Sequence, residues 1–135
     1  MIQTGFPSGG PTLGDVGERA VIQSIVDVTP SSINGDDAAV LHRSSPNSRV
    51  VATTDMLVEG RHFRWDVTTP RQVGRKAIVQ NFADIEAMGA RPLAALLSLS
   101  APKDLSVAVV TDLARGIGDE AVSYTHLTLP TNREV

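Results

Sequence analysis

The sequence GDDAAV at residues 35–40 places two adjacent carboxylates, Asp36 and Asp37, between a turn and an apolar run. The preceding Asn34-Gly35 pair is typical of a turn, and the run from Ala38 to Leu41 is typical of a short strand. Taken alone, an Asp-Asp pair after glycine most often caps or closes the turn. The pair gains interest because two further aspartates occupy comparable positions downstream.

These two aspartates are Asp55 and Asp84. Asp55 ends the β-branched and apolar run 49–55, so it could simply close a strand. Asp84 lies inside a helical pattern, where aspartate is a poor residue, and the helical wheel places it beside the apolar face. Burying an unpaired carboxylate is costly. We therefore expect a cation beside Asp84, with Arg75 and Lys76 as the simple alternative to a metal ion.

Three carboxylates on separate elements could converge on one place. Cysteine is absent, and hard oxygen ligands suit Mg²⁺, which usually bridges a phosphate. The residues therefore predict a magnesium-dependent enzyme that acts on phosphates. His62 could be an ordinary loop residue, or it could contact a phosphorylated aromatic substrate together with Arg64 and Trp65. No Walker-type or protein-kinase-type glycine loop is present.

Apolar periodicity predicts three helices and three strands. The first helix covers residues 17–28. The second is capped by Thr69 and ends at Gly89. The third is capped by Asp104 or Ser106 and ends near residue 121. The strands cover residues 38–41, 49–55 and 92–100. The last strand is almost continuously apolar, which predicts burial on both faces.

Composition limits the class of protein. The chain has 135 residues, a net charge of −3 and no cysteine, so it fits one cytosolic domain with no electrostatic case for binding nucleic acid or an anionic membrane. No apolar run is long enough to span a bilayer, and the start lacks the features of a signal peptide. Residues 1–14 are rich in glycine and proline and predict a flexible arm.

Four longer stretches carry a specific resemblance. Their order and spacing across roughly residues 14–121 resemble the thiamine-monophosphate kinase family of the aminoimidazole ribonucleotide synthetase-like superfamily. The stretches are GDDAAVL (35–41), TTDMLVEGRHF (53–63), GRKA (74–77) and NFADIEAMGARP (81–92). The second stretch favours the kinase over the other ATP-dependent members of the superfamily.

The resemblance implies an α/β (α+β) fold, in which a mixed sheet carries helices on one face and pairs with a second copy to form a dimeric barrel. It implies ATP-dependent phosphorylation of thiamine monophosphate to thiamine diphosphate, a cytoplasmic location and a homodimer. By position, Asp37, Thr53, Thr54, Asp55 and Asp84 would bind several Mg²⁺ ions, and His62 would contact the substrate. No catalytic side chain is assigned, because the transfer would be direct and in line.

The resemblance also divides the chain. Residues 15–121 would be the N-terminal metal- and ATP-binding domain, shortened relative to the family. Residues 122–135 resemble translated sequencing-adapter sequence and predict a non-native tail. The family continues with a further metal-binding segment and a C-terminal domain, so we expect the 135-residue chain to be inactive or nearly so. The alternatives are a non-catalytic module that binds Mg²⁺ or phosphate, or that dimerises, and another ATP-dependent member of the same superfamily.

Overall fold

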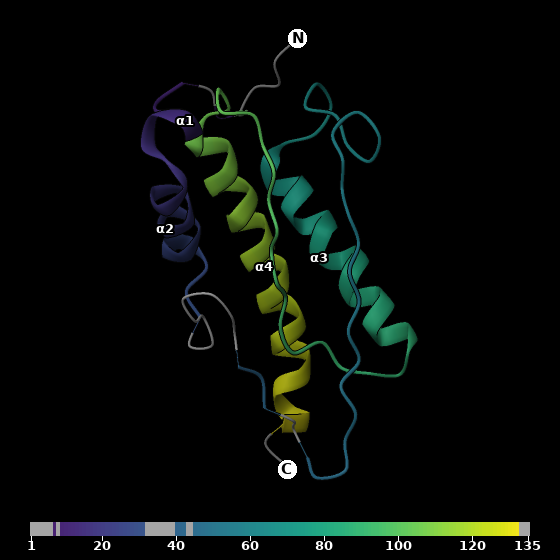
Figure 1. Ribbon diagram of the computed structural model, residues 1–135. Coiled ribbons are helices and arrows are strands. Elements are labelled where there is room, and N and C mark those ends of the chain that lie inside the picture. The colour runs from purple at the N-terminus through teal and green to yellow at the C-terminus, as the bar shows by residue number, and fades with distance from the viewer. Residues whose placement is uncertain (1–6, 8, 32–39, 43–44, 133–135) are drawn as a thin grey trace.

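The computed structural model describes residue 7 and residues 9–31, 40–42 and 45–132, with the backbone alone described for residues 125–132. In this part of the chain the helices are α1 (Leu13–Val16), α2 (Glu18–Val28), α3 (Pro70–Ala87) and α4 (Val107–Asn132). α4 lies between α2 and α3 and packs most extensively on α3 (Figure 1). None of the helices in the described residues is long and apolar enough to cross a membrane.

α3 begins and ends at the residues that the sequence predicts. The Thr69 hydroxyl accepts a hydrogen bond from the Gln72 N–H at 3.3 Å, and the Gln72 side chain accepts one from the Thr69 N–H at 3.0 Å. This capping box precedes Pro70 at the first helical position. At the other end, Gly89 has φ +73° and the Ala90 N–H reaches the Ile85 carbonyl at 3.2 Å, which is a Schellman ending.

Glycine brings α3 and α4 into close contact. A Cβ atom at Gly74 would lie 2.0 Å from the Leu113 backbone oxygen, and one at Gly116 would lie 2.0 Å from the Arg71 backbone oxygen. Each helix therefore places a carbonyl where the other would carry a side chain. At the edge of this contact, the Arg71 guanidinium lies 2.8 Å from the Asp119 carboxylate.

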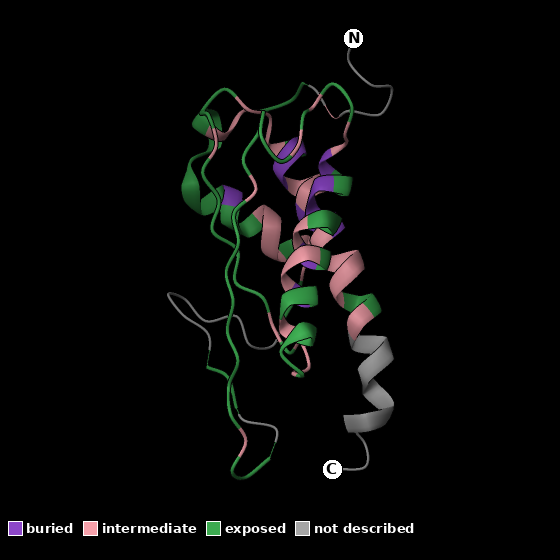
Figure 2. Cartoon of the chain, turned by 90° about the vertical axis from the view of Figure 1, so that its right-hand side faces the viewer, coloured by how far each residue is buried: buried purple, intermediate pink, exposed green. Residues whose placement is uncertain are grey.

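The buried side chains lie around this contact. They come from α2, α3 and α4, and the larger ones are Val21, Val73, Ile78, Phe82, Val109 and Val110. In Figure 2 the buried positions are confined to the helices. Ser106 caps α4 by accepting the Ala108 N–H at 3.2 Å, so of the two caps predicted from the sequence, Ser106 is the one used.

The predicted strands 49–55 and 92–100 do not form, and residues 38–39 of the predicted strand 38–41 lie outside the described residues. Segments 49–58 and 91–101 contain no strand and run along one face of the helical layer (Figures 1 and 2). Their apolar side chains are exposed: Val50 retains 71% and Leu96 87% of their accessible surface. A strand needs a hydrogen-bonding partner, and the isolated bridges among the described residues, Thr12–Ser106 and Glu59–Phe63, lie outside these two segments. The expected mixed sheet is therefore not seen among the described residues, and it stays a prediction.

Two chain ends also differ from expectation. Residues 9–14, which the sequence places in the flexible arm, are held against the start of α4; for example, the Leu13 N–H donates to the Leu105 carbonyl at 2.9 Å. At the other end, α4 continues through residue 132, so the expected helix end near residue 121 is wrong. Tyr124 packs edge-on against Phe82, with ring centroids 4.9 Å apart, so the turn of α4 that contains Tyr124 contacts α3. The non-native origin of residues 122–135 stays a prediction.

We expect the Gly116→Ala variant to lose about 1–3 kcal/mol of unfolding free energy, because the added methyl group would force α3 and α4 apart. Urea unfolding followed by circular dichroism measures this loss. Gly118→Ala is the matched control on the same helix. Its Cβ would lie 3.3 Å from the movable Thr29 methyl group, and alanine favours the helix. Equal stability of the two variants would contradict the close-contact account.

Candidate functional site

A tight turn at residues 58–63 precedes α3. The Arg61 and His62 N–H groups donate to the Val58 carbonyl at 3.1 and 2.8 Å, and the Gly60 N–H donates to the Phe63 carbonyl at 2.8 Å. Gly60 has φ +82°, a region that costs other residues strain. The turn is therefore closed by its own backbone.

The ring of His62 has a defined orientation. Its Nδ1 atom accepts a hydrogen bond from the Val58 N–H at 2.9 Å. Because Nδ1 uses its lone pair, the proton of the neutral ring is on Nε2. His62 is exposed, so it can offer this Nε2–H to a ligand outside the turn.

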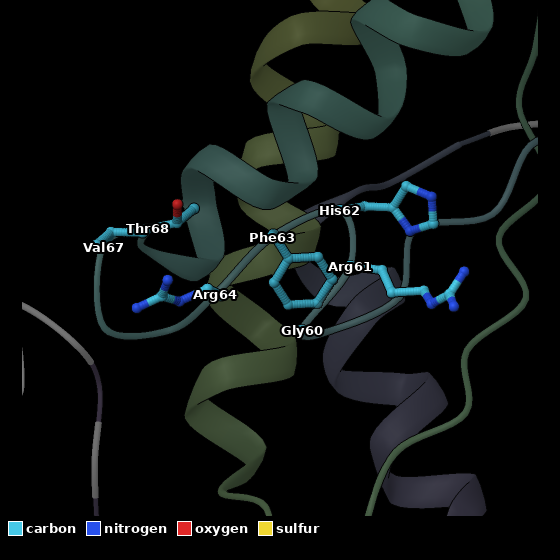
Figure 3. Close-up of a pocket in the computed structure, with 7 residues that line it drawn as sticks. All are labelled: Gly60, Arg61, His62, Phe63, Arg64, Val67 and Thr68. Atoms are coloured by element: carbon cyan, nitrogen blue, oxygen red, sulfur yellow. The ribbon is translucent and has the colours of Figure 1, made fainter.

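The turn and residues 64, 67 and 68 that follow it line an open pocket of about 260 Å³. Figure 3 shows the Phe63 ring at its centre, with His62 and Arg61 on one side and Arg64, Val67 and Thr68 on the other. Phe63 also contacts Trp65, with ring centroids 4.7 Å apart. Asp66 pairs with Arg64, which leaves Arg61 and His62 as polar groups that reach outward. The pocket thus combines the aromatic ring of Phe63 with the nearby guanidinium of Arg61.

Asp55 is anchored by α3. The Gln80 amide donates to its Oδ2 atom, and the Met56 N–H donates to its Oδ1 atom at 2.8 Å. The Gln80 hydrogen bond first, and then the Met56 N–H, hold the pKa of Asp55 below its ordinary value. Asp55 is therefore a carboxylate at neutral pH, with both oxygens directed.

Asp84 does not border the buried face of α3 as the wheel predicts, because its side chain is exposed. The buried strip of α3 is narrow and follows Val73, Gly74, Ile78 and Phe82. An exposed carboxylate needs no cation partner. Arg75 lies instead 3.6 Å from Asp119.

Of the three predicted aspartates, the structure describes Asp55 and Asp84. Asp84 follows Gln80 by one helical turn, which places it near the residue that holds Asp55. Thr53 and Thr54 are exposed beside Asp55. Asp37 lies outside the described residues. Among the described residues, no three acidic or histidine side chains gather closely enough to hold a metal ion.

The donor chemistry nevertheless suits Mg²⁺. The predicted ligands Thr53, Thr54, Asp55 and Asp84 offer only oxygen atoms, and all are exposed. Each Asp55 oxygen accepts one hydrogen bond from the protein and keeps further lone-pair capacity. The residues present are therefore compatible with a hydrated magnesium ion, which retains several water ligands.

The sequence pattern did not identify Gln80, and it suggested Lys76 only as a partner for Asp84. The structure shows that the Lys76 ammonium donates to the His62 carbonyl. The sequence feature that could have indicated Lys76 and Gln80 is the four-residue spacing of polar residues at 76, 80 and 84. That spacing ordinarily indicates a solvated helix face.

Comparison with known proteins identifies related chains. A family model described as "AIR synthase related protein, N-terminal domain" matches residues 35–128. The chain is 62% identical over 116 residues to a Corynebacterium glutamicum protein named thiamine-monophosphate kinase, covering 86% of this chain and 35% of that protein. Proteins of the same name from Mycobacterium tuberculosis and Synechococcus elongatus are 47% and 32% identical, over 82% and 78% of this chain and 34% and 32% of theirs. The chain thus spans about a third of the length of these relatives. No solved structure gives a significant match.

The orientation of His62 generates a prediction. In ¹⁵N-edited NMR of the neutral ring, we expect a protonated Nε2 and an unprotonated Nδ1, because Nδ1 accepts the Val58 N–H. His42, in a separate segment, serves as the internal reference. A protonated Nδ1 in the neutral ring would contradict the turn geometry.

Proposed function

Because the chain belongs to the AIR synthase related family, as its N-terminal domain, we propose that it is the N-terminal part of a thiamine-monophosphate kinase. The reaction would transfer the γ-phosphoryl group of ATP to thiamine monophosphate and give thiamine diphosphate. The observation that supports this most strongly is 62% identity to a protein of that name over 86% of this chain. The match includes the turn that carries His62 and the segment that carries Asp55.

The substrate would bind at the pocket beside the 58–63 turn. Thiamine monophosphate combines flat rings with an anionic phosphate. The Phe63 ring, which lines the pocket and contacts Trp65, offers aromatic surface, and the Nε2–H of His62 and the guanidinium of Arg61 offer donors for a phosphate. This pairing of aromatic and donor groups is the chemical reason for placing the substrate here.

Magnesium ions would be held by Asp37, Thr53, Thr54, Asp55 and Asp84. When bound, the ions would neutralise the phosphates of ATP and thiamine monophosphate. The chain's own contribution is to direct these oxygens, and the two hydrogen bonds to Asp55 do this before any ion arrives. ATP as co-substrate belongs to the same proposal.

Further features follow from family membership and are part of the proposal. They are a homodimer formed through paired sheets, a cytoplasmic location and the absence of turnover by the 135-residue chain alone. The last rests on the relatives being about three times as long as the matched segment. A non-catalytic module that binds Mg²⁺ or phosphate, or that dimerises, is the competing possibility. No specific contact favours it.

We expect isothermal titration to detect binding of thiamine monophosphate in the presence of Mg²⁺ and ATP. Replacing His62 with alanine should weaken this binding by about 10- to 100-fold, the usual effect of losing a hydrogen bond to a charged group. His42→Ala is the matched control, because His42 is also exposed but lies in another segment. Absence of binding to the unsubstituted chain, or equal loss in both variants, would contradict the proposal.

A further inference from the structure

α3 presents a row of polar residues at positions 76, 80 and 84, each separated by four residues. Residues at this spacing are neighbours on one side of a helix. The segment 55–62 passes along this side, since Lys76 donates to the carbonyl of His62 and Gln80 donates to the carboxylate of Asp55. Two consecutive turns of one helix thus reach both ends of the segment.

We propose that Lys76 and Gln80 are positioning residues that fix the 55–62 segment against α3, so that His62 and Asp55 face one bound ligand. Lys76 sets the turn that carries His62, and Gln80 sets the carboxylate of Asp55. The inference deepens the proposed function, on which it rests, by adding two residues to the predicted site.

Lys76 acts on the residue whose ring is already constrained. The His62 ring is fixed through Nδ1 by the Val58 N–H, and the His62 carbonyl is fixed by the Lys76 ammonium. Because both the ring and the backbone carbonyl of His62 are held, its Nε2–H has one direction relative to α3. Without Lys76 the turn would keep its internal bonds but could pivot on the helix.

The energetic contribution of Lys76 to the overall fold is small. Its side chain is exposed, and exposed polar contacts contribute little to stability. The helices are instead held by the buried side chains and by the close contact at Gly74 and Gly116. A loss of ligand affinity without a loss of stability would therefore be the signature of positioning.

Gln80 acts on a different atom. It directs Asp55 Oδ2, while Oδ1 is directed by the Met56 N–H. A leucine at position 80 would keep most of the volume and remove the donor. This change should alter the carboxyl signal of Asp55 and leave the ring signals of His62 unchanged, because Lys76 still holds the turn.

The test uses the full 135-residue chain with Lys76→Met, Lys76→Arg and Gln80→Leu. The methionine variant keeps the aliphatic stem and removes the ammonium, whereas arginine keeps a donor. Lys103→Met is the matched control, because Lys103 is also exposed and lies before α4. For each variant, NMR records the His62 ring nitrogens and the Asp55 carboxyl carbon without ligand. Titration calorimetry then records the affinity for thiamine monophosphate with Mg²⁺ and ATP.

We expect Lys76→Met to shift or broaden the His62 ring signals and to weaken binding by about tenfold, the scale of one hydrogen bond to a charged group. Lys76→Arg should restore most of the His62 ring signals and most of the affinity, and Lys103→Met should change neither the signals nor the affinity. Unchanged ring signals in Lys76→Met, or no rescue by arginine in a folded variant, would overturn the role of Lys76. An unchanged Asp55 signal in Gln80→Leu would overturn that of Gln80.

The two levels of the proposal fail separately. If the unsubstituted chain does not bind thiamine monophosphate, the proposed function fails. The ligand-free NMR signals still decide whether Lys76 and Gln80 hold the segment. If the Lys76→Met variant unfolds, the His62 ring signals of the Lys76→Arg variant test the role of Lys76. Ring signals that differ from those of the unsubstituted chain would then contradict the proposal.

Discussion

The close approach of α3 and α4 is the constraint on which the rest of the described structure depends. Each helix places a backbone oxygen 2.0 Å from where a Cβ of the other would lie, at Gly74 and Gly116. Only glycine permits that distance, and the buried side chains of α2, α3 and α4 lie around this contact. The Arg71–Asp119 ion pair lies beside this contact and adds little by comparison, since it is partly exposed.

Because α3 is fixed in this way, its opposite side can serve as a support. The candidate site is not inside the hydrophobic core. It consists of a self-closed turn and an anchored carboxylate, both joined to α3 by single side chains. Such a site keeps its ligand atoms exposed to solvent, as hydrated magnesium and phosphate require. The support also explains why the residues that direct the site lie on a helix rather than in the turn itself.

Sequence reasoning succeeded where structure is decided locally. The Thr69 cap, Pro70 and the Gly89 ending are short-range signals, and the structure confirms them. The predicted strands depend on partners distant in the chain, and no local pattern supplies them. Segment 92–100 shows this best, because its apolar run predicts burial yet Leu96 is 87% exposed.

The candidate site was predictable to a similar extent. His62 and Asp55 stood out through their neighbours in the sequence, and the structure places both beside α3. Asp84 was placed beside the buried face because the wheel assumed a broad apolar strip. In the structure the buried side of α3 follows Val73, Gly74, Ile78 and Phe82, and Asp84 is exposed. Gln80 could not be found from the pattern, because its role depends on a contact with a residue 25 positions earlier.

The most direct test of this account is to titrate thiamine monophosphate, with Mg²⁺ and ATP, into the ¹⁵N-labelled chain and map the backbone amide signals that move. The account predicts that the shifts cluster in residues 55–68 and in the turn of α3 that contains Lys76 and Gln80. Shifts confined to α1 and α2, or none at ligand saturation, would contradict it.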